Sequence, residues 1–333
     1  MEKLREDLLN LIDPSVNLTL RETNGLTHLG LDDEKDTVLI EVLVEKNVEE
    51  TESLRKEIIK LVKIKHNHKG IKLNLTEKRV HYSIVNSGIT CIGIISGKGG
   101  VGKSSVAANL AYRFMKKGYN TAVIDADIYG SSIPDLLETG HQQPYANEEQ
   151  KIIPIKKDNI EVMSTEFFTQ EHEPVIWRAG MLHSMLDYFF YETAWNPKTN
   201  VIIIDFPPGT GDVMLDIKQY IKNPKMLLVT TPHPAAANVA IKAGIAAQKM
   251  EQDVVGIIEN MAYYTDPDTN KKHYIFGQNG GLTAAQNLNA ELIAQIPIEV
   301  PKHHQCLYEI TEPAGKIYND IVDYLVYILD IKK

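Results

Sequence analysis

Cysteine is scarce in this sequence: its 333 residues include only Cys91 and Cys306. Two thiols exclude a disulfide-based scaffold, and one chain alone cannot supply the four thiolates of a cysteine-ligated metal site. Long apolar runs are also missing, since none approaches the roughly 20 residues that span a bilayer. The amino-terminal stretch MEKLREDLLNLIDPS lacks the uninterrupted apolar segment of a signal peptide. We therefore expect a cytoplasmic protein with no stable membrane insertion.

The chain has no excess of positive charge, because 35 basic residues stand against 44 acidic ones, a net charge of −9. This balance excludes a globally cationic nucleic-acid binder. The charge is uneven, however: residues 1–52 carry 5 basic and 14 acidic side chains, whereas residues 53–79 carry 9 and 2. Lys56, Lys60 and Lys63 fall on one face of an expected helix. Two interpretations remain open for this basic segment, a merely solvated face or a patch that binds DNA or an acidic partner.

Hydrophobic patterning divides the chain into two parts. Residues 1–85 predict a small α+β domain, with strands at 37–44 and 71–75 and helices before residue 13 and over about 48–65. Beyond residue 88, strand-like apolar runs alternate with helical stretches; the runs lie at 89–95, 121–125, 201–205, 226–230 and 254–258. Strands that are apolar on both faces are typical of a parallel sheet covered by helices on each side. The predicted fold over 88–333 is therefore a doubly wound, mainly parallel α/β domain with its ligand at the carboxyl ends of the strands.

A glycine-rich segment follows the run at 89–95 and satisfies the P-loop pattern G-x-x-x-x-G-K-[ST]. Glycines let successive backbone N–H groups converge on phosphate, and the start of the next helix adds positive potential. We expect Lys103 to reach the β- and γ-phosphates and the Ser104 hydroxyl to ligate Mg²⁺. The predicted nucleotide-binding residues of this segment are Gly97, Lys98, Gly99, Gly100, Val101, Gly102, Lys103, Ser104 and Ser105.

Acidic residues follow two further predicted strands. Asp125 and Asp127 belong to the segment DADIYGSSIP after the run at 121–125, and Asp205 ends the apolar run VIIID. An acid at the end of a buried strand is costly unless a cation or a hydrogen-bond donor satisfies it, which favours a metal site. We therefore expect Asp125 and Asp205 to complete a Mg²⁺ site with Ser104.

Lys98 is a second lysine just after the first glycine of the P-loop, which marks the deviant Walker A motif. Together with the segments DADIYGSSIP, DFPPGTGD and ENM, it makes the chain resemble the Mrp/ApbC family of iron–sulfur-associated P-loop ATPases, relatives of MinD and ParA. The resemblance implies slow, Mg²⁺-dependent ATP hydrolysis by a homodimer in which Lys98 reaches the partner subunit's nucleotide. It also implies that Asp127 orients the attacking water beside Lys103, and that Asn260 binds adenine. Residues 1–85 resemble the small domain often fused ahead of this ATPase.

One departure from the family concerns the C-x-x-C pair that follows the ENM segment in cluster-carrying members. The corresponding positions here hold Asp266 and Thr269, whose oxygens cannot replace thiolate sulfur on cluster iron. Cys306, next to His303 and His304, is the remaining candidate; it is either a surface-loop residue or a ligand of a 4Fe–4S cluster shared across a dimer. The function therefore stays open between iron–sulfur cluster assembly, with a client apoprotein as partner, and ATP-gated regulation through DNA or a protein partner.

A last pattern lies at the carboxyl end, where apolar residues are spaced as in an amphipathic helix: Ile317, Ile321, Tyr324, Leu325 and Ile328. MinD-like relatives use such a helix on membranes, a use that requires lysine or arginine beside the apolar face. The polar positions here include three aspartates. We therefore expect this helix to pack on its own domain.

Overall fold

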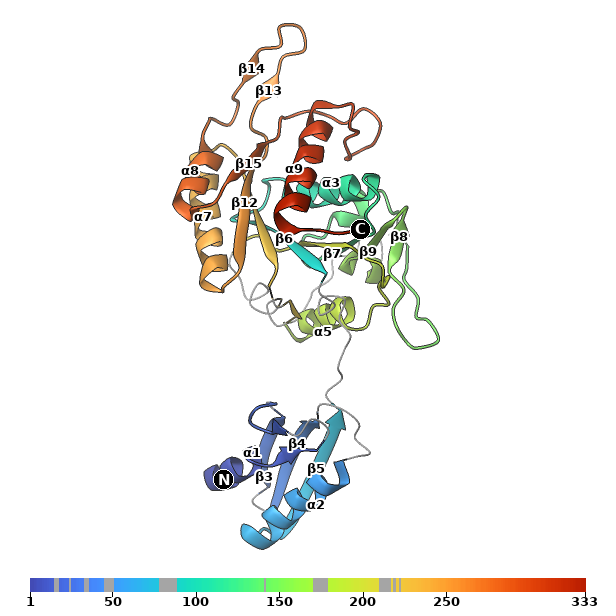
Figure 1. Cartoon of the computed structure of the whole chain (residues 1–333), viewed down its shortest axis with the longest axis vertical. Coiled ribbons are helices and arrows are strands. Elements are labelled where there is room, and N and C mark those ends of the chain that lie inside the picture. Colours follow the sequence, from blue (N-terminus) through green and yellow to red (C-terminus); the bar gives the residue numbers. More distant parts are fainter. Residues whose placement is uncertain are drawn as a thin grey trace. The chain divides into compact units, whose positions relative to one another are not determined.

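The computed structural model describes residues 1–14, 18–23, 25–32, 36–44, 51–77, 89–140, 142–169, 179–209, 217, 220–221 and 223–333. The chain forms two compact units, Met1–His81 and Tyr82–Lys333. The domain ends that the sequence predicts, residues 85 and 88, lie outside the described residues. Figure 1 shows a small unit built around one sheet and a larger unit in which helices cover a longer sheet.

The small unit packs two helices on a sheet with the order β3-β4-β5, in which β3 and β4 are antiparallel and β4 and β5 parallel. Strand β4 alternates buried and less buried residues, so its apolar side chains face Leu4 and Leu8 of α1 and Leu54 and Ile58 of α2. The predicted strands at 37–44 and 71–75 are confirmed. The elements are α1 Glu2–Leu9, β1 Ile12–Asp13, β2 Leu18–Thr19, β3 Leu26–Asp32, β4 Thr37–Val44, α2 Glu52–Lys60 and β5 Gly70–Glu77.

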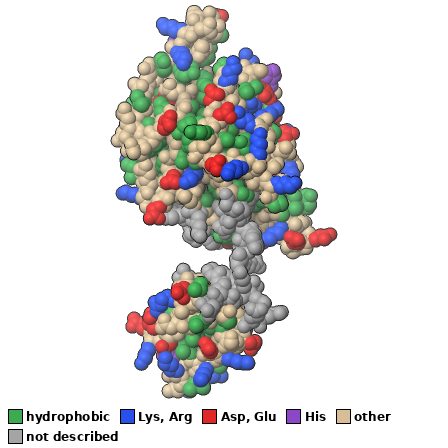
Figure 2. Space-filling view, viewed as in Figure 1, with side chains coloured by type: hydrophobic (Ala, Val, Ile, Leu, Met, Phe, Trp, Pro, Cys, Tyr) green, Lys and Arg blue, Asp and Glu red, His purple; other side chains and the backbone are tan. Residues whose placement is uncertain are grey.

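The helix expected over about 48–65 is confirmed from residue 52 to residue 65, and residues 48–50 lie outside the described part of the chain. Helix α2 ends at Lys60 and continues as one π-helical turn, Leu61–Lys65. Val62 of this turn is completely buried, and Leu61 is half-buried against the same apolar core. Lys56, Lys60 and Lys63 are all exposed, and Figure 2 shows basic and acidic side chains side by side on the visible face of this unit. DNA binding by residues 53–79 stays a prediction.

The large unit contains an eight-stranded sheet with the order β15-β12-β11-β6-β10-β7-β9-β8. Every pairing is parallel except that of β8 with β9. The predicted fold class is therefore confirmed, and each of the predicted apolar runs is a strand. The strands are β6 Thr90–Ser96, β7 Thr121–Asp125, β8 Ile155–Lys157, β9 Ile160–Met163, β10 Val201–Asp205, β11 Lys225–Thr230, β12 Asp253–Glu259 and β15 Leu292–Gln295.

Two apolar cores cover the two faces of this sheet. Alternate residues of each strand enter opposite cores: Ile92 and Ile94 of β6 join one, and Cys91 and Ile95 join the other. Cys91 therefore acts as a small buried apolar residue. One core includes α3 and α9, and the other α5, α7 and α8. The helices are α3 Lys103–Lys116, α4 Ile133–Leu136, α5 Ala179–Phe190, α7 Pro234–Lys249, α8 Gly280–Leu288 and α9 Pro313–Leu329.

Helix α9 packs on its own domain, which confirms that prediction. Tyr318, Ile321, Val322 and Leu325 are buried in the core that α9 shares with α3, whereas Ile328 is 38% exposed. Among the described helices, none combines the length and the apolar character needed to cross a membrane.

Candidate functional site

The P-loop joins the carboxyl end of β6 to the start of α3 and so lies at the edge of the sheet where parallel strands end. Gly102 has a φ of +81°, a left-handed conformation that favours glycine. A Cβ there would also lie 2.2 Å from the Asn260 side-chain nitrogen. Gly102 is thus required both by the turn and by the close approach of Asn260. The sequence alone gives the first of these reasons, and the fold gives the second.

Lys103, Ser104, Asp127 and Asp205 come together at this edge. The Lys103 ammonium lies 2.6 Å from Asp205 Oδ1 and 3.5 Å from Asp127 Oδ2. The Ser104 hydroxyl donates to the second oxygen of Asp205 at 2.5 Å. Asp205 is fully buried, and Lys103 is only 6% exposed. The structure therefore brings together residues that the sequence placed in three separate segments.

Two fully buried carboxyl groups, those of Asp125 and Asp205, lie near the single ammonium of Lys103. Burial, followed by the charge of Asp205, raises the pKa of Asp125 to about 8. Burial also raises the pKa of Asp205, against the lowering effect of Lys103. Carboxylate and hydroxyl oxygens are the ligands that Mg²⁺ prefers. The donor set around Ser104 and Asp205 therefore suits Mg²⁺.

Asp125 holds the segment that carries Asp127. Its oxygens accept hydrogen bonds from the backbone N–H groups of Asp127, Ser132 and Ile133, at 3.2 to 3.3 Å, and from the Ser164 hydroxyl at 3.1 Å. Sequence reasoning missed Ser164, which is fully buried after β9. Ser164 reaches Asp125 because β9 lies next to β7 in the sheet. The sequence does not reveal this neighbour because it does not give the strand order.

Asn260 is buried, whereas Lys98 is exposed. The Asn260 amide is 8% exposed and donates to the Val101 carbonyl of the P-loop at 2.9 Å. This contact places Asn260 beside the loop, as the adenine prediction requires. Lys98, by contrast, is exposed, and its backbone carbonyl accepts a hydrogen bond from Ser96 at 3.1 Å.

A family model described as the NUBPL iron-transfer P-loop NTPase, of the ParA group, matches residues 89–322. The chain belongs to this family. The resemblance that the P-loop, DADIYGSSIP and ENM segments indicate is therefore confirmed. Membership establishes a P-loop NTPase domain and leaves the particular reaction of this chain to be argued from its residues.

Two curated relatives show how far the similarity extends. The iron–sulfur cluster carrier protein of Bacillus subtilis (strain 168) is 43% identical over 235 residues, which cover 69% of this chain and 66% of that protein. The iron–sulfur cluster carrier protein of Mycobacterium tuberculosis (strain ATCC 25618 / H37Rv) is 41% identical over 205 residues, covering 62% and 53%. The matched part of the chain thus spans about half to two thirds of these relatives.

Solved structures agree on the fold of this P-loop NTPase. The nucleotide-binding protein of Archaeoglobus fulgidus, in complex with ADP, is 29% identical with a TM-score of 0.52, covering 72% of this chain and 90% of that one. The cell division ATPase MinD of Pyrococcus furiosus is 19% identical with a TM-score of 0.51, covering 72% and 99%. The MinD similarity concerns the fold alone.

The positions expected to replace the family's cysteines lie on a short hairpin, β13 Tyr264–Thr265 and β14 Lys272–His273. Asp266 Oδ1 accepts hydrogen bonds from the Thr269 backbone at 2.8 Å and from the Thr269 hydroxyl at 2.9 Å. It also accepts one from the Asp268 backbone at 3.0 Å. These two side chains therefore close the turn at the tip of the hairpin.

Cys306 is poorly suited to bind iron within one chain. Burial, with the nearby charges of Glu138 and Asp135, raises the pKa of its thiol and disfavours the thiolate that binds metal. His304 is already engaged by the Tyr112 hydroxyl at 3.0 Å and by Glu138 at 3.4 Å. In the described part of the chain, no three His, Cys, Asp or Glu side chains are grouped so as to hold a metal.

Glu309 lies near His304 and Tyr112, and its contribution to stability should depend on pH. A hydrogen bond from the Tyr112 hydroxyl, reinforced by Lys116, His304 and Arg113, lowers the pKa of Glu309 from 4.5 to about 2. Because the pKa of Glu309 is lower in the folded chain than in the unfolded chain, the carboxylate stabilises the fold at pH values above the unfolded pKa, near 4.5. This contribution is lost as the pH falls toward 2. We expect Glu309→Gln to reduce the free energy of unfolding at pH 7, with a deficit that shrinks below pH ~4.5.

Urea unfolding of the Glu309→Gln variant and the unchanged chain between pH 7 and pH 3 measures this dependence. Glu148→Gln, on an exposed turn, is the matched control and should leave the unfolding free energy unchanged. A Glu309→Gln deficit of equal size at both pH values would contradict the assignment.

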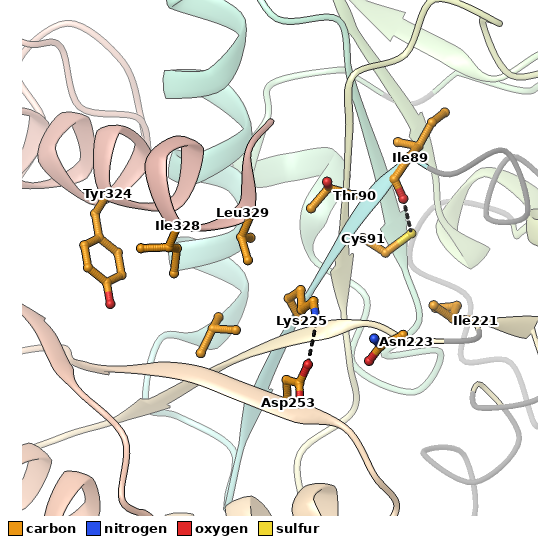
Figure 3. Close-up of a pocket in the computed structure, with 11 residues that line it drawn as sticks. Ile89, Thr90, Cys91, Ile221, Asn223, Lys225, Asp253, Tyr324, Ile328 and Leu329 are labelled. Carbon is orange, nitrogen blue, oxygen red and sulfur yellow. Dashed lines mark hydrogen bonds and ion pairs between the residues drawn. The ribbon is translucent and has the colours of Figure 1, made fainter. Parts of the chain in front are cut away.

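A separate cavity of about 700 Å³ lies at the opposite edge of the sheet, where β6, β11 and β12 begin. Figure 3 shows its polar part, an ion pair of 2.5 Å between Lys225 and Asp253, facing Tyr324 and Ile328 of α9 across the opening. Cys91 borders this cavity, and burial raises the pKa of its thiol to about 12, so the thiol stays protonated and unreactive. The predicted nucleotide residues are absent from its lining.

Proposed function

We propose that this chain is an ATP-hydrolysing, homodimeric switch that acts in iron–sulfur cluster assembly. One observation carries the proposal: Lys103, Ser104, Asp127 and Asp205 converge beside a P-loop, with the Lys103 ammonium shared between two carboxylates. Phosphoryl transfer needs mainly positioning and neutralisation of charge, and this group of side chains supplies both. Family membership supports nucleotide hydrolysis in general.

Each side chain has a distinct role in this proposal. Lys103 would bind the phosphate oxygens of ATP, and Asp205 with Ser104 would hold Mg²⁺. When bound, Mg²⁺ neutralises charge on the transferred phosphoryl group. Asp127 accepts a hydrogen bond from the attacking water, and Asp125 fixes the segment that carries Asp127. Asn260, already oriented by the Val101 carbonyl, binds the adenine.

Lys98 supports the dimeric part of the proposal. Its side chain is exposed although it belongs to the loop that surrounds the phosphates. An exposed ammonium at this position is available to a phosphate held by a second subunit. Occupancy of both sites would therefore join two chains, and hydrolysis would release them. The resemblance of Lys98 to the second lysine of the deviant Walker A motif supplies the analogy for this arrangement.

The cargo part of the proposal rests on the relatives, two of which are named iron–sulfur cluster carrier proteins. The residues of this chain do not fit a cluster at the family's cysteine pair, because Asp266 and Thr269 offer only oxygen and already bond each other. We therefore propose that the switch serves a client apoprotein in cluster assembly without carrying a cluster at this hairpin.

Light scattering during gel filtration tests the switch. We expect the unchanged chain to run as a dimer with ATP and Mg²⁺ and as a monomer with ADP, and Lys98→Ala to stay monomeric with ATP. Lys242→Ala, an exposed lysine on α7, is the matched control and should dimerise. A mass that ATP does not change would contradict the dimeric switch.

The same ATP-bound sample is then incubated with iron and sulfide without oxygen. We expect less than one four-iron cluster per dimer, because the hairpin lacks thiolates. A stoichiometric cluster that is lost in Cys306→Ala would instead establish Cys306 as a ligand and overturn the cluster-free assignment.

A further inference from the structure

Glu259, the last residue of β12, is a buried carboxylate that ties together three elements. It is 1% exposed. Its Oε2 accepts a hydrogen bond from the Gly281 backbone N–H at 2.6 Å, and its Oε1 accepts one from the Gln295 side chain at 2.7 Å. Gly281 lies in the first turn of α8, and Gln295 ends β15. A carboxylate at the start of a helix is also favoured by the helix dipole.

The contact between Glu259 and α8 is tight. A Cβ at Gly281 would lie 2.7 Å from the Glu259 Cβ, closer than two carbon atoms tolerate. Glycine at position 281 therefore lets the helix start approach the end of β12 closely enough for the backbone N–H to reach the carboxylate. Movement of β12 away from α8 would lengthen this hydrogen bond.

Between Glu259 and Gly281 the chain leaves the sheet as the β13–β14 hairpin, which projects from the large unit in Figure 1. The Glu259–Gly281 hydrogen bond thus joins the two ends of the segment that carries the hairpin, which we call the hairpin base. The hairpin and the residues that follow it expose several large apolar side chains, which are Tyr264, Tyr274, Ile275 and Phe276. Three of these side chains, Tyr274, Ile275 and Phe276, are consecutive in the chain directly after β14.

The residue next to Glu259 contacts the P-loop. The Asn260 backbone N–H donates to the Thr230 carbonyl of β11 at 2.8 Å, and its side chain donates to the Val101 carbonyl. One peptide unit therefore separates a side chain beside the nucleotide site from the carboxylate that closes the hairpin base. The nucleotide site and the hairpin base are therefore connected through two adjacent residues, Asn260 and Glu259.

We propose that Glu259 is a positioning residue that transmits nucleotide occupancy to the β13–β14 hairpin. The inference rests on the proposed ATP binding at the P-loop and Asn260. A bound nucleotide restrains Asn260 and with it the carboxyl end of β12. Because Glu259 fixes that end to the start of α8, the hairpin base is restrained as well, and the motion of the hairpin is reduced. Coupling of this kind acts through the loss of motion and needs no change of average structure.

Hydrogen–deuterium exchange with and without ADP–Mg²⁺ or ATP–Mg²⁺ tests the coupling. In the unchanged chain we expect nucleotide to slow exchange of the 263–276 amides at least about fivefold, the lower end of measured coupling between sites. In Glu259→Ala we expect nucleotide affinity within about threefold of the unchanged chain and no slowing in the hairpin, because Glu259 does not touch the P-loop. Glu259→Gln, which keeps an acceptor for Gly281, should restore the slowing.

Controls separate this role from simple stabilisation. Glu291→Gln alters another carboxylate beside β15, one that accepts from the Tyr324 hydroxyl, and should keep the nucleotide response of the hairpin. If Glu259→Ala does not fold, Gly281→Ala displaces the same contact without removing the charge. Nucleotide binding without hairpin slowing in the unchanged chain, or a full response in a folded Glu259→Ala or Gly281→Ala, would overturn the coupling alone. A chain that binds no nucleotide would overturn the proposed function as well.

Discussion

Replacing Lys103 by alanine should abolish ATP hydrolysis, with a fall in kcat of at least about 100-fold, as for loss of one preorganised charge-stabilising donor. The structure adds a second effect, because Lys103 is the cation 2.6 Å from the fully buried Asp205. Removing one partner of a buried ion pair leaves an uncompensated charge and typically costs about 3–5 kcal/mol. Asp205 can instead take up a proton, since burial already raises its pKa, and this uptake limits the loss of stability.

Phosphate release and thermal unfolding of Lys103→Ala measure the two effects separately. Lys249→Ala removes an exposed lysine from the end of α7 and should change neither. The double variant Lys103→Ala with Asp205→Asn should recover stability and remain inactive, because it removes both buried charges together. Undiminished turnover in Lys103→Ala would refute the P-loop assignment.

Replacing Asp127 by alanine should separate binding from hydrolysis. Asp127 lies 3.5 Å from the Lys103 ammonium, whereas Asp205 contacts both Lys103 and Ser104. Loss of Asp127 therefore leaves the Lys103–Asp205–Ser104 contacts in place. We expect ATP affinity within about threefold of the unchanged chain and kcat reduced about 10²–10⁴-fold, the range for a group that manages a proton or water in the transition state.

Equilibrium binding of a fluorescent ATP analogue and phosphate release under saturating ATP test this prediction. Asp135→Ala, an exposed acid eight residues further along, is the matched control and should behave as the unchanged chain. Normal phosphate release by Asp127→Ala would refute its role, and loss of nucleotide binding would place Asp127 among the binding residues instead.

Asp125 and Glu259 illustrate where local pattern was insufficient. Both are acids at the end of a buried strand, and the sequence assigns Asp125 to the Mg²⁺ site on that ground. The structure gives Asp125 three backbone donors and Ser164, so its visible contacts organise the Asp127 segment. Glu259 likewise finds its donors in Gly281 and Gln295. An acid at the end of a buried strand indicates that a cation or hydrogen-bond donors lie nearby. Which groups these are depends on the neighbouring strands and helices.

The P-loop, the parallel strands and the acids that follow them can be predicted without the fold, because glycine spacing, continuous apolar runs and strand-end charges are local signals. The absence of cysteine from residues 264–273 is likewise read directly from the chain. The strand order, the sharing of Lys103 between Asp127 and Asp205, and the closure of the hairpin base by Glu259 become visible only in the folded domain. Those contacts join residues 22 to 102 positions apart, and the order in which strands pair is fixed by packing of the whole sheet between its two cores.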